Sequence, residues 1–547
     1  MRVMVRTILD KAFTALSALS VLLLCLVLVL ILGPMTWRGL GAIVFRGTVE
    51  FRKMQLAEFE HGNEAKIQAE AVETEAARKY VYEMIDTFKR GIDTEELTEK
   101  VRKIHRDFGA ELRYKQTPRQ QYTELRSITR DIRDRLEVAF ASQDRRQIVE
   151  HIEYVLQYEQ DERFNGTMVD GFFELAREFQ QAVADIDLRK RHEYEQDLTE
   201  VEQILFGSGE QPGLLGPRPD EPLPVLAMNR YGATRWDVAQ SLLDRLLWRE
   251  EWVQEEPDEP QVKVRTSRVE RFAGTKLEPL FSFVEQNLDK MLKPRWTFYW
   301  RYFVDDSTPG HYFGGIGPEI VGTVVLTVLS MLFVVPLGVI SAAYLVECAS
   351  DSLAVRIIRT CINTLAGVPS IVFGLFGLAF FVLYFLPLFG APSKPCILAG
   401  SLTLAVLTLP VMIRASEEAI RSVPQTYKEA SLALGASRFR SFVTVTLPAA
   451  LPGILTGIIL SLSRVAGETA PLLFTAAVAV GPIPRSLFST TRTLSYGSWH
   501  MAVGDRLSAL VPHNQYGMVV TLVTLVLCLN GLAIIVRARV FRRLKGQ

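Results

Sequence analysis

Two ionisable residues, Arg464 and Glu468, lie inside a long apolar run in the C-terminal part of the chain. An arginine within a membrane-spanning helix costs about 2.5–3.5 kcal/mol on insertion scales, so such a residue usually faces a cavity or a partner. The spacing of four residues places both side chains on one helix face, where they can pair. An arginine also presents a planar fork of donors that suits an oxyanion. Arg464 is therefore a candidate anion contact, with Glu468 and the Thr469 hydroxyl nearby; the alternative is a structural ion pair that only neutralises itself.

A second polar segment, residues 416–449, separates two apolar runs. Val423-Pro424 and Gly435 favour two short helices joined by a turn, with Lys428 and Glu429 exposed. Such a turn can fit into a groove of a partner protein, whereas the alternative is an amphipathic loop in solvent. The residues of this candidate docking turn are Glu429, Ala430, Ser431, Leu434, Gly435 and Ala436.

Six apolar runs are long enough to cross a bilayer, because a helical span needs about 20 apolar residues. The runs are residues 14–33, 320–346, 366–389, 396–413, 450–478 and 517–536. The first is longer than the apolar region of a signal peptide and ends in Gly33-Pro34, so we expect an uncleaved anchor. The predicted fold class is an all-α membrane protein with six transmembrane helices.

Basic residues beside the spans predict the orientation of the chain. With six spans, all of the basic groups fall on one side, and the positive-inside bias makes that side the cytoplasm. We therefore expect both termini in the cytoplasm and residues 34–310 outside it. The basic groups are Arg2, Arg6, Lys11, Arg356, Arg359, Arg414, Arg421, Lys428, Arg438, Arg440, Arg537, Arg539, Arg542, Arg543 and Lys545.

The long segment 34–310 is predicted to be mostly helical. Residues 50–310 hold 52 acidic and 39 basic residues, a net charge of −13, which leaves +13 for the rest of the chain. We expect Thr234 to cap a helix, and we expect the Gly- and Pro-rich stretch 207–224 to be a linker or long loop that divides the segment into two parts. The segment is either a sensor or docking domain or a helical bundle without chemistry of its own. Apolar stripes at helical spacing run through Val81, Ile85, Phe88 and Ile92, through Leu125, Ile128, Ile132, Leu136 and Phe140, through Val169, Phe173, Ala176, Phe179 and Val183, and through Val238, Leu242 and Leu246.

Several classes of function lack their usual signature in this sequence. No GxxxxGK[ST] motif occurs, so the chain shows no sign of binding ATP itself, and no constellation of residues supports an enzyme. The histidines and cysteines show no metal-ligand spacing, so we expect no metal and no other cofactor. No basic block with interleaved aromatic residues suggests nucleic acid.

The docking turn, followed by Val445, Leu447 and Pro448, resembles the EAA loop of ABC importer permeases. Ser431 and Val445 replace the Ala and Ile of that motif. The resemblance implies that the turn seats on an ATPase subunit and passes its movement to the flanking spans.

Residues 464–476, RVAGETAPLLFTA, resemble the signature of the PstA family, one of the two permease halves of bacterial phosphate importers. The paired PstC family shares the Arg-Ala-x-Gly-Glu-Thr core, so the Ala-Pro-Leu-Leu tail favours PstA. The resemblance covers residues 311–547 and the first span, and it says nothing about residues 34–310. The expected organisation is an N-terminal span at 1–33, an insertion at 34–310 and a five-helix permease core at 311–547.

The resemblance implies a permease subunit of an ATP-driven phosphate importer in the bacterial inner membrane. Expected partners are the lipid bilayer, a PstC-like second permease, two PstB-like ATPase subunits and a periplasmic PstS-like phosphate-binding protein. Arg464, Glu468, Thr469 and Arg414 would then lie on the substrate path, although Arg414 is equally an ordinary flanking charge. Glu468 would either orient Arg464 or accept a hydrogen from protonated phosphate. Two alternatives stay open: an importer permease for sulfate or molybdate, and a membrane-anchored sensor or scaffold that works through residues 34–310.

Overall fold

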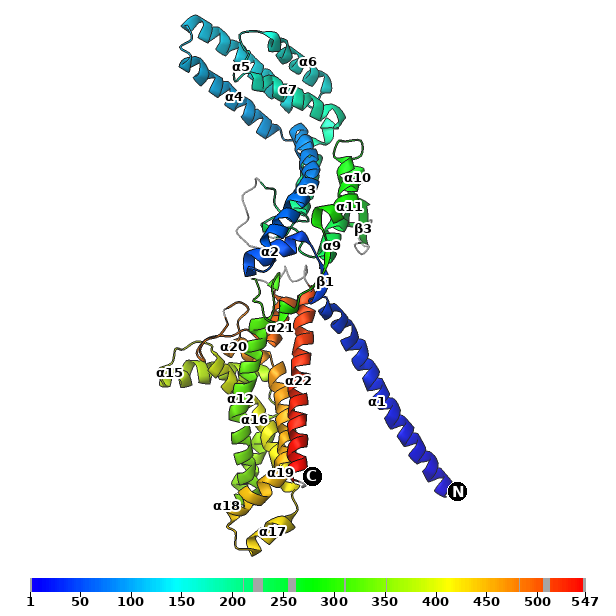
Figure 1. The fold of residues 1–547 in the computed structure, drawn as a ribbon, viewed down its shortest axis with the longest axis vertical. Coiled ribbons are helices and arrows are strands. Elements are labelled where there is room, and N and C mark those ends of the chain that lie inside the picture. Colours follow the sequence, from blue (N-terminus) through cyan, green and yellow to red (C-terminus); the bar gives the residue numbers. More distant parts are fainter. Residues whose placement is uncertain are drawn as a thin grey trace. The chain divides into compact units, whose positions relative to one another are not determined.

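The computed structural model describes residues 2–209, 211–219, 230–253, 262–308, 311–350, 352–481, 483–504 and 512–544. The chain forms two compact units (Figure 1), which we call the membrane unit (residues 1–45 and 297–547) and the inserted unit (residues 46–296). The inserted unit is shorter at both ends than the predicted segment 34–310, because residues flanking it belong to the membrane unit.

The described part of the membrane unit is mostly helical. Its elements are α1 (Arg2–Leu40), η5 (Trp300–Phe303), α12 (Gly317–Ala343) continued by η7 (Tyr344–Cys348), α13 (Leu353–Leu365), α14 (Ser370–Gly377) continued by η8 (Leu378–Phe385) and α15 (Leu386–Leu388), α16 (Ile397–Arg421), α17 (Gln425–Ala433), α18 (Arg438–Ser441) continued by η9 (Phe442–Thr446), α19 (Leu447–Gly467), α20 (Ala470–Thr475), α21 (Leu494–Val503) and α22 (Pro512–Leu544).

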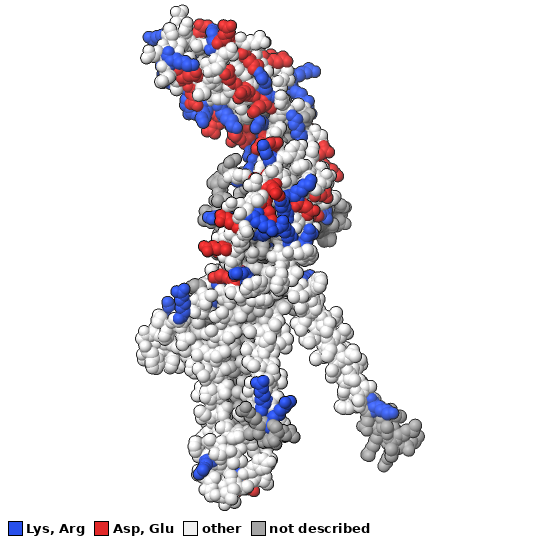
Figure 2. All heavy atoms as spheres, in the orientation of Figure 1, with Lys and Arg blue, Asp and Glu red and all other residues white. Residues whose placement is uncertain are grey.

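Six helices among the described residues are long and apolar enough to cross a membrane, which confirms the predicted number of spans. They are Lys11–Leu40, Gly317–Cys348, Ser370–Leu388, Ile397–Arg421, Arg438–Gly467 and Pro512–Arg542. Figure 2 shows that charged side chains are sparse over these helices and dense over the inserted unit, as expected if only the former contact lipid.

The fifth span ends earlier than the sequence pattern predicts. We expected it to run to residue 478, but α19 stops at Gly467 and a separate short helix, α20, begins at Ala470. Pro471 explains the break, because it has no N–H to bond to the carbonyl of residue 467 and its ring clashes with a continuing helix.

Small residues bring α19 against α16. A Cβ added at Gly457 would lie 2.6 Å from the Cβ of Ala415, and one at Gly453 would lie 2.7 Å from that of Ala419. These glycines therefore permit a close helix crossing of the kind common in membranes. Gly467 has no such neighbour, since an added Cβ there would meet nothing within 4 Å.

The inserted unit is also mostly helical. Its elements, including the strands at which the chain enters and leaves it, are β1 (Val44–Gly47), α2 (Val49–Phe59), α3 (Glu64–Ile92), α4 (Thr94–Tyr114), α5 (Arg119–Ala141), α6 (Arg145–Leu156), η1 (Gln157–Gln160), α7 (Asp170–Ala182), η2 (Val183–Asp185), η3 (Leu188–Lys190), α8 (Arg191–Phe206), α9 (Trp236–Leu247), β2 (Trp248–Val253), β3 (Val262–Ser267), α10 (Arg268–Arg271), α11 (Glu278–Leu292) and β4 (Arg295–Phe298). β1 pairs with β4, and β2 pairs antiparallel with β3.

Two hydrophobic cores lie within the inserted unit. One joins α3, α8, α9 and α11 around Phe88, Phe272 and Phe281, and the other joins α4 to α7 around Phe140 and Phe179. All four predicted apolar stripes lie in these cores, with Leu125 and Ile128 at the edge of the second. Each stripe is on the face that its helix turns inward, as its spacing requires.

Two expectations about the inserted unit were wrong. Thr234 does not cap α9, because Arg235 holds that position while the Thr234 carbonyl accepts a hydrogen bond from the Thr48 N–H. The stretch after Gly207 does not divide the unit either. Leu214 and Leu215 are buried in the first core and bond back to the end of α8, so helices on both sides of the stretch share one core.

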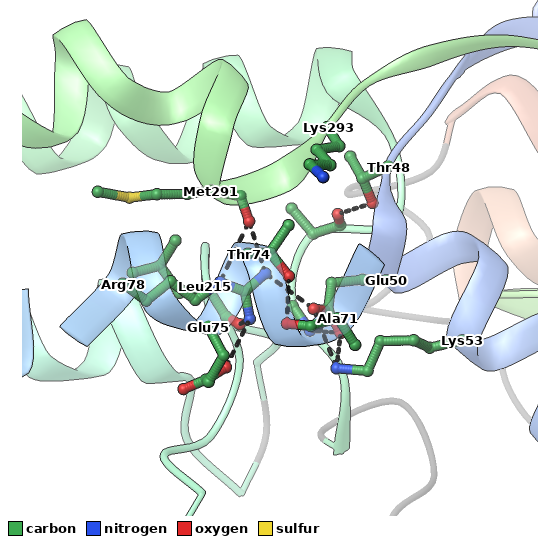
Figure 3. A network of polar contacts seen from close by, with 12 residues as sticks. Thr48, Glu50, Lys53, Ala71, Thr74, Glu75, Arg78, Leu215, Met291 and Lys293 are labelled. Carbon is green, nitrogen blue, oxygen red and sulfur yellow. Dashed lines mark hydrogen bonds and ion pairs between the residues drawn. The ribbon is translucent and has the colours of Figure 1, made fainter. Parts of the chain in front are cut away.

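A buried ion pair fastens the first core (Figure 3). Arg78 Nη2 lies 2.8 Å from Glu50 Oε1, and the same guanidinium donates to the carbonyls of Met291 and Leu215. Burial works to raise the pKa of the Glu50 carboxyl, but Arg78 and Lys53 outweigh it and hold that pKa below its usual value. Arg78 therefore joins α2, α3, the 214–216 turn and the end of α11.

Candidate substrate path and coupling loop

The Arg464–Glu468 pair forms as predicted, although the helix does not continue through it. Glu468 directly follows α19 in extended conformation, with φ −76° and ψ 127°. Its Oε1 nevertheless lies 3.4 Å from Arg464 Nε. Both side chains are half-buried, with 34% of Arg464 and 19% of Glu468 exposed. The pair uses Nε, and the guanidinium carries further N–H donors on its two Nη groups.

Thr469 occupies the break between α19 and α20. It is half-buried, and its carbonyl accepts hydrogen bonds from the amides of Leu472 and Leu473 at 3.1 and 3.2 Å. Thr469 therefore begins α20 next to the ion pair. An arginine in the last turn of a candidate span is thus followed, just beyond the end of that span, by a carboxylate and a hydroxyl.

Arg414 lies elsewhere in the membrane unit. It is on the exposed side of α16, and its Nε donates to Asn363 Oδ1 of α13 at 2.8 Å. Within the described residues, no hydrogen bond or ion pair links Arg414 to Arg464 or Glu468. The structure thus joins three of the four predicted path residues in one place and puts Arg414 in a separate contact.

The segment around Glu429 has the predicted helix–turn–helix form. α17 ends in a Schellman motif, in which the Gly435 N–H bonds to the Leu432 carbonyl at 2.9 Å and the Ala436 N–H bonds to the Ser431 carbonyl at 3.1 Å. Gly435 has φ +88°, a value that residues with a Cβ rarely adopt. The turn geometry therefore depends on a glycine at position 435.

The tip of this turn exposes apolar side chains. Leu434 is 90% exposed, Phe439 78% and Tyr427 56%, and Glu429 is also exposed. Three apolar groups this exposed on one turn form a surface suited to a partner.

Polar contacts brace the turn from behind. The hydroxyl of Ser431, the residue that departs from the motif, is hydrogen-bonded to the hydroxyl of Ser441. Lys428 was expected to be exposed, but its Nζ pairs with Glu347 in η7 and it is only half exposed. The structure thus connects α17 both to α18 and to the end of the α12 span.

Sequence analysis missed a buried charged cluster formed by His311, Glu319 and Arg492. Glu319 Oε1 lies 3.0 Å from His311 Nε2 and 3.4 Å from Arg492 Nη1, and each of the three residues is at most 3% exposed. One signal was available, because Glu319 is an acidic residue at the start of an apolar run, where a carboxylate is costly without a partner. Its arginine partner lies far away in sequence and could not be chosen from spacing.

Comparison with known proteins places the membrane unit in a family. Residues 318–546 match the family described as binding-protein-dependent transport system inner membrane component. The chain is 40% identical over 200 residues to the probable ABC transporter permease protein YqgI of Bacillus subtilis, covering 34% of this chain and 66% of the relative. It is 39% identical to the phosphate transport system permease protein PstA 1 of Mycobacterium tuberculosis, covering 32% of this chain and 55% of the relative.

A third relative is matched over more of its length. The probable phosphate transport system permease protein PstA of Methanocaldococcus jannaschii is 36% identical over 209 residues, covering 36% of this chain and 72% of the relative. Among solved structures, the inward-facing MetNI methionine ABC transporter aligns with a TM-score of 0.32 at 20% identity, covering 41% of this chain and 94% of the other. The chain spans between about half and two thirds of the length of the first relatives that it matches.

The chain belongs to the binding-protein-dependent inner membrane components, which are ABC transporter permeases. Within that class it is a PstA-type permease and a multi-pass inner-membrane protein, which confirms the resemblance found in its sequence. The matched region contains Arg464, Glu468, Thr469, Arg414 and the candidate docking turn, and it leaves out the inserted unit.

Proposed function

We propose that this chain is one permease subunit of an ATP-driven phosphate importer. The observation that carries the proposal is the half-buried Arg464–Glu468 pair at the break between α19 and α20, within the region matched to phosphate permeases. An arginine fork in a water-poor passage binds a phosphate oxyanion, and the adjacent carboxylate keeps the site weak enough for release. Glu468 also favours a protonated anion, because it can accept a hydrogen that fully ionised sulfate lacks.

The proposal also assigns a role to the docking turn and an orientation to the chain in the membrane. Glu429, Ala430, Ser431, Leu434, Gly435 and Ala436 form the surface that an ATPase subunit grips, and the exposed Leu434 and Phe439 supply its apolar contact. The Lys428–Glu347 ion pair then carries the movement of the turn into the α12 span. Both termini and the coupling turn face the cytoplasm, and the inserted unit faces the opposite side.

The proposed partners follow from this arrangement. A second, PstC-like permease completes the passage, two PstB-like ATPase subunits supply the energy, and a PstS-like binding protein delivers phosphate. Arg414 donates a hydrogen bond to Asn363 of α13. It would contact the anion only if α13 and α16 line the passage.

The test is reconstitution of the chain with its partner subunits in lipid vesicles, with ATP hydrolysis measured against added anion. We expect phosphate with its binding protein to stimulate hydrolysis and labelled phosphate to accumulate, while sulfate and molybdate do neither. If only sulfate or only molybdate stimulates ATP hydrolysis, that anion is the substrate in place of phosphate. If no anion stimulates ATP hydrolysis and none accumulates in the vesicles, the result would contradict the proposal of an anion importer.

A further inference from the structure

The cluster of His311, Glu319 and Arg492 is the most deeply buried group of ionisable residues in the described part of the membrane unit. Arg492 contacts three acceptors: Ser307 Oγ at 2.9 Å, Glu319 Oε1 at 3.4 Å and the carboxylate of Asp306. A buried charge without a partner is strongly unfavourable. Removal of Arg492 leaves the Glu319 carboxylate without its arginine, and removal of Glu319 leaves Arg492 with Asp306, whose side chain is half exposed, as its remaining carboxylate. Such a cluster persists only if the surrounding chain holds it in one geometry.

The residues that follow Arg492 lie directly on α12. A Cβ added at Gly322 would overlap the Arg492 carbonyl oxygen, which leaves glycine as the residue that fits there. Two residues after Arg492, the Leu494 N–H donates to Thr323 Oγ1 of α12 at 3.0 Å. The Thr323 hydroxyl in turn donates to the Glu319 carbonyl at 2.8 Å. The ion pair and these contacts fix residues 491–495 against the first turns of α12.

This fixed segment reaches the candidate substrate path. Ser495 Oγ donates to the backbone carbonyl of Glu468 at 3.2 Å. Because Glu468 lies outside α19 in extended backbone, no helical hydrogen-bond ladder holds that carbonyl, and Ser495 supplies a restraint. A chain of contacts thus leads from Glu319 and Arg492 through residues 493–495 to the backbone carbonyl of Glu468, the residue whose side chain pairs with Arg464.

We propose that Glu319 and Arg492 are positioning residues for the Arg464–Glu468 pair. They hold residues 491–495 on α12, and Ser495 in turn sets the backbone that aims the Glu468 carboxylate. Because α12, α19 and α21 meet through this segment, movement of α12 against α19 changes the orientation of the pair. This inference rests on the proposed role of Arg464 and Glu468 in the path.

A test that does not depend on the transported anion uses a thiol at the break. In a chain whose five cysteines (Cys25, Cys348, Cys361, Cys396 and Cys528) are replaced, Thr469→Cys is reacted with a soluble maleimide in the assembled complex. We expect Glu319→Gln to raise the reaction rate about tenfold or more, because a lost hydrogen bond between charged groups is worth at least about that factor. Glu319→Asp, which keeps the charge, should recover most of the original rate.

A matched control and a second variant complete the experiment. Ser307→Ala removes one neutral hydrogen bond to Arg492 but leaves both carboxylates, so it should leave the rate within about twofold. If Glu319→Gln prevents assembly, Arg492→Lys replaces it, since a point charge cannot reach all three acceptors and the rate should still rise. An unchanged thiol rate in an assembled Glu319→Gln or Arg492→Lys complex would overturn the positioning role.

Parallel uptake measurements separate this inference from the proposed function. Labelled phosphate uptake is compared in Glu319→Gln, Glu319→Asp and the parent chain, each with Thr469 intact. A raised thiol rate in a complex that moves a different anion would retire phosphate as the substrate and keep the positioning role. Normal phosphate uptake with an unchanged thiol rate would keep phosphate as the substrate and contradict the positioning role.

Discussion

Single residues carry the chemistry of this permease, and Arg464 is the first to test. Its guanidinium pairs with Glu468 through Nε at 3.4 Å and is one-third exposed. The geometry fits a residue that exchanges one acceptor for another, because the pair is neither fully buried nor fully solvated. Replacement of Arg464 should therefore affect transport more than folding.

We expect Arg464→Ala to reduce phosphate uptake by about one to two orders of magnitude, since a hydrogen bond to a charged group is worth about 1.5–3 kcal/mol. The complex should still assemble, because Glu468 is partly exposed and can be hydrated. Arg464→Lys keeps the charge without the fork and should give intermediate uptake. Uptake of labelled phosphate is the measurement, and wild-type uptake in Arg464→Ala would remove this residue from the path.

A second prediction at this scale concerns His105 in α4 of the inserted unit. Burial, with Arg126, Arg133 and Arg130 adding to it, lowers the pKa of His105 to about 4. The ordinary value is near 6.5, so between these values the unfolded chain binds a proton that the folded chain does not. The stability of the α4–α7 core should therefore fall as the pH drops from 7 to 5.

Hydrogen exchange of the α4 and α5 amides, corrected for intrinsic rates, measures this effect in the intact chain. Protection should fall several-fold from pH 7 to pH 5, and His105→Gln should reduce that pH dependence. Carboxylates with lowered pKa values, such as Glu50, lose their contribution only at lower pH, so they leave this window clear. Equal pH dependence in the variant would show that other groups are responsible.

At the scale of elements, the candidate docking turn shows how local sequence determines which side chains a turn exposes. Gly435 at φ +88° closes the Schellman motif, and the motif turns Leu434 outward to 90% exposure. A β-branched residue at that φ costs about 1–3 kcal/mol. The turn would therefore open rather than carry the strain.

We expect Gly435→Val to lower co-purification of the ATPase subunits about tenfold, because the apolar tip would no longer keep its shape. Gly390→Val is the matched control. Gly390 also has positive φ (+76°) and an added Cβ would meet nothing within 4 Å, but it lies in the loop after α15. Normal ATPase recovery with Gly435→Val, or equal loss with Gly390→Val, would contradict a docking role for the turn.

At the scale of the whole molecule, the two units have separate hydrophobic cores. The inserted unit begins and ends at neighbouring points of the membrane unit, since the Tyr299 N–H donates to the Ile43 carbonyl at 2.7 Å. A short Gly/Ser linker can therefore join residue 45 to residue 297 without moving either end. This permits a direct test of what the insertion contributes.

We expect the chain without residues 46–296 to insert into the membrane and to recover the same partner subunits in pull-down, because all six spans keep their packing. Retained phosphate uptake would assign the insertion an accessory role, whereas uptake lost from an assembled complex would favour a sensor or docking domain. Failure of the shortened chain to insert, with the intact chain as control, would contradict the independence of the two units.

Local sequence determined a large part of this protein. Continuous apolar runs predicted the six spans, because a helix needs about 20 apolar residues to cross a bilayer. Helical stripes such as Val81, Ile85, Phe88 and Ile92 predicted buried faces, and Gly435 predicted a turn. In these cases the deciding contacts lie within one helix or turn, or with the surrounding solvent. Arg464 and Glu468 were found as ionisable residues four apart inside an apolar run, although Glu468 lies just beyond the end of α19.

Contacts between distant segments were decided only by tertiary structure. Glu319 meets Arg492, Lys428 meets Glu347, and Arg78 reaches Leu215 and Met291, although no periodicity relates the members of these pairs. The separation of Arg414 from Arg464 belongs to the same group. A buried charge requires a partner, but which partner it meets depends on how helices pack, and packing is fixed by many side chains at once.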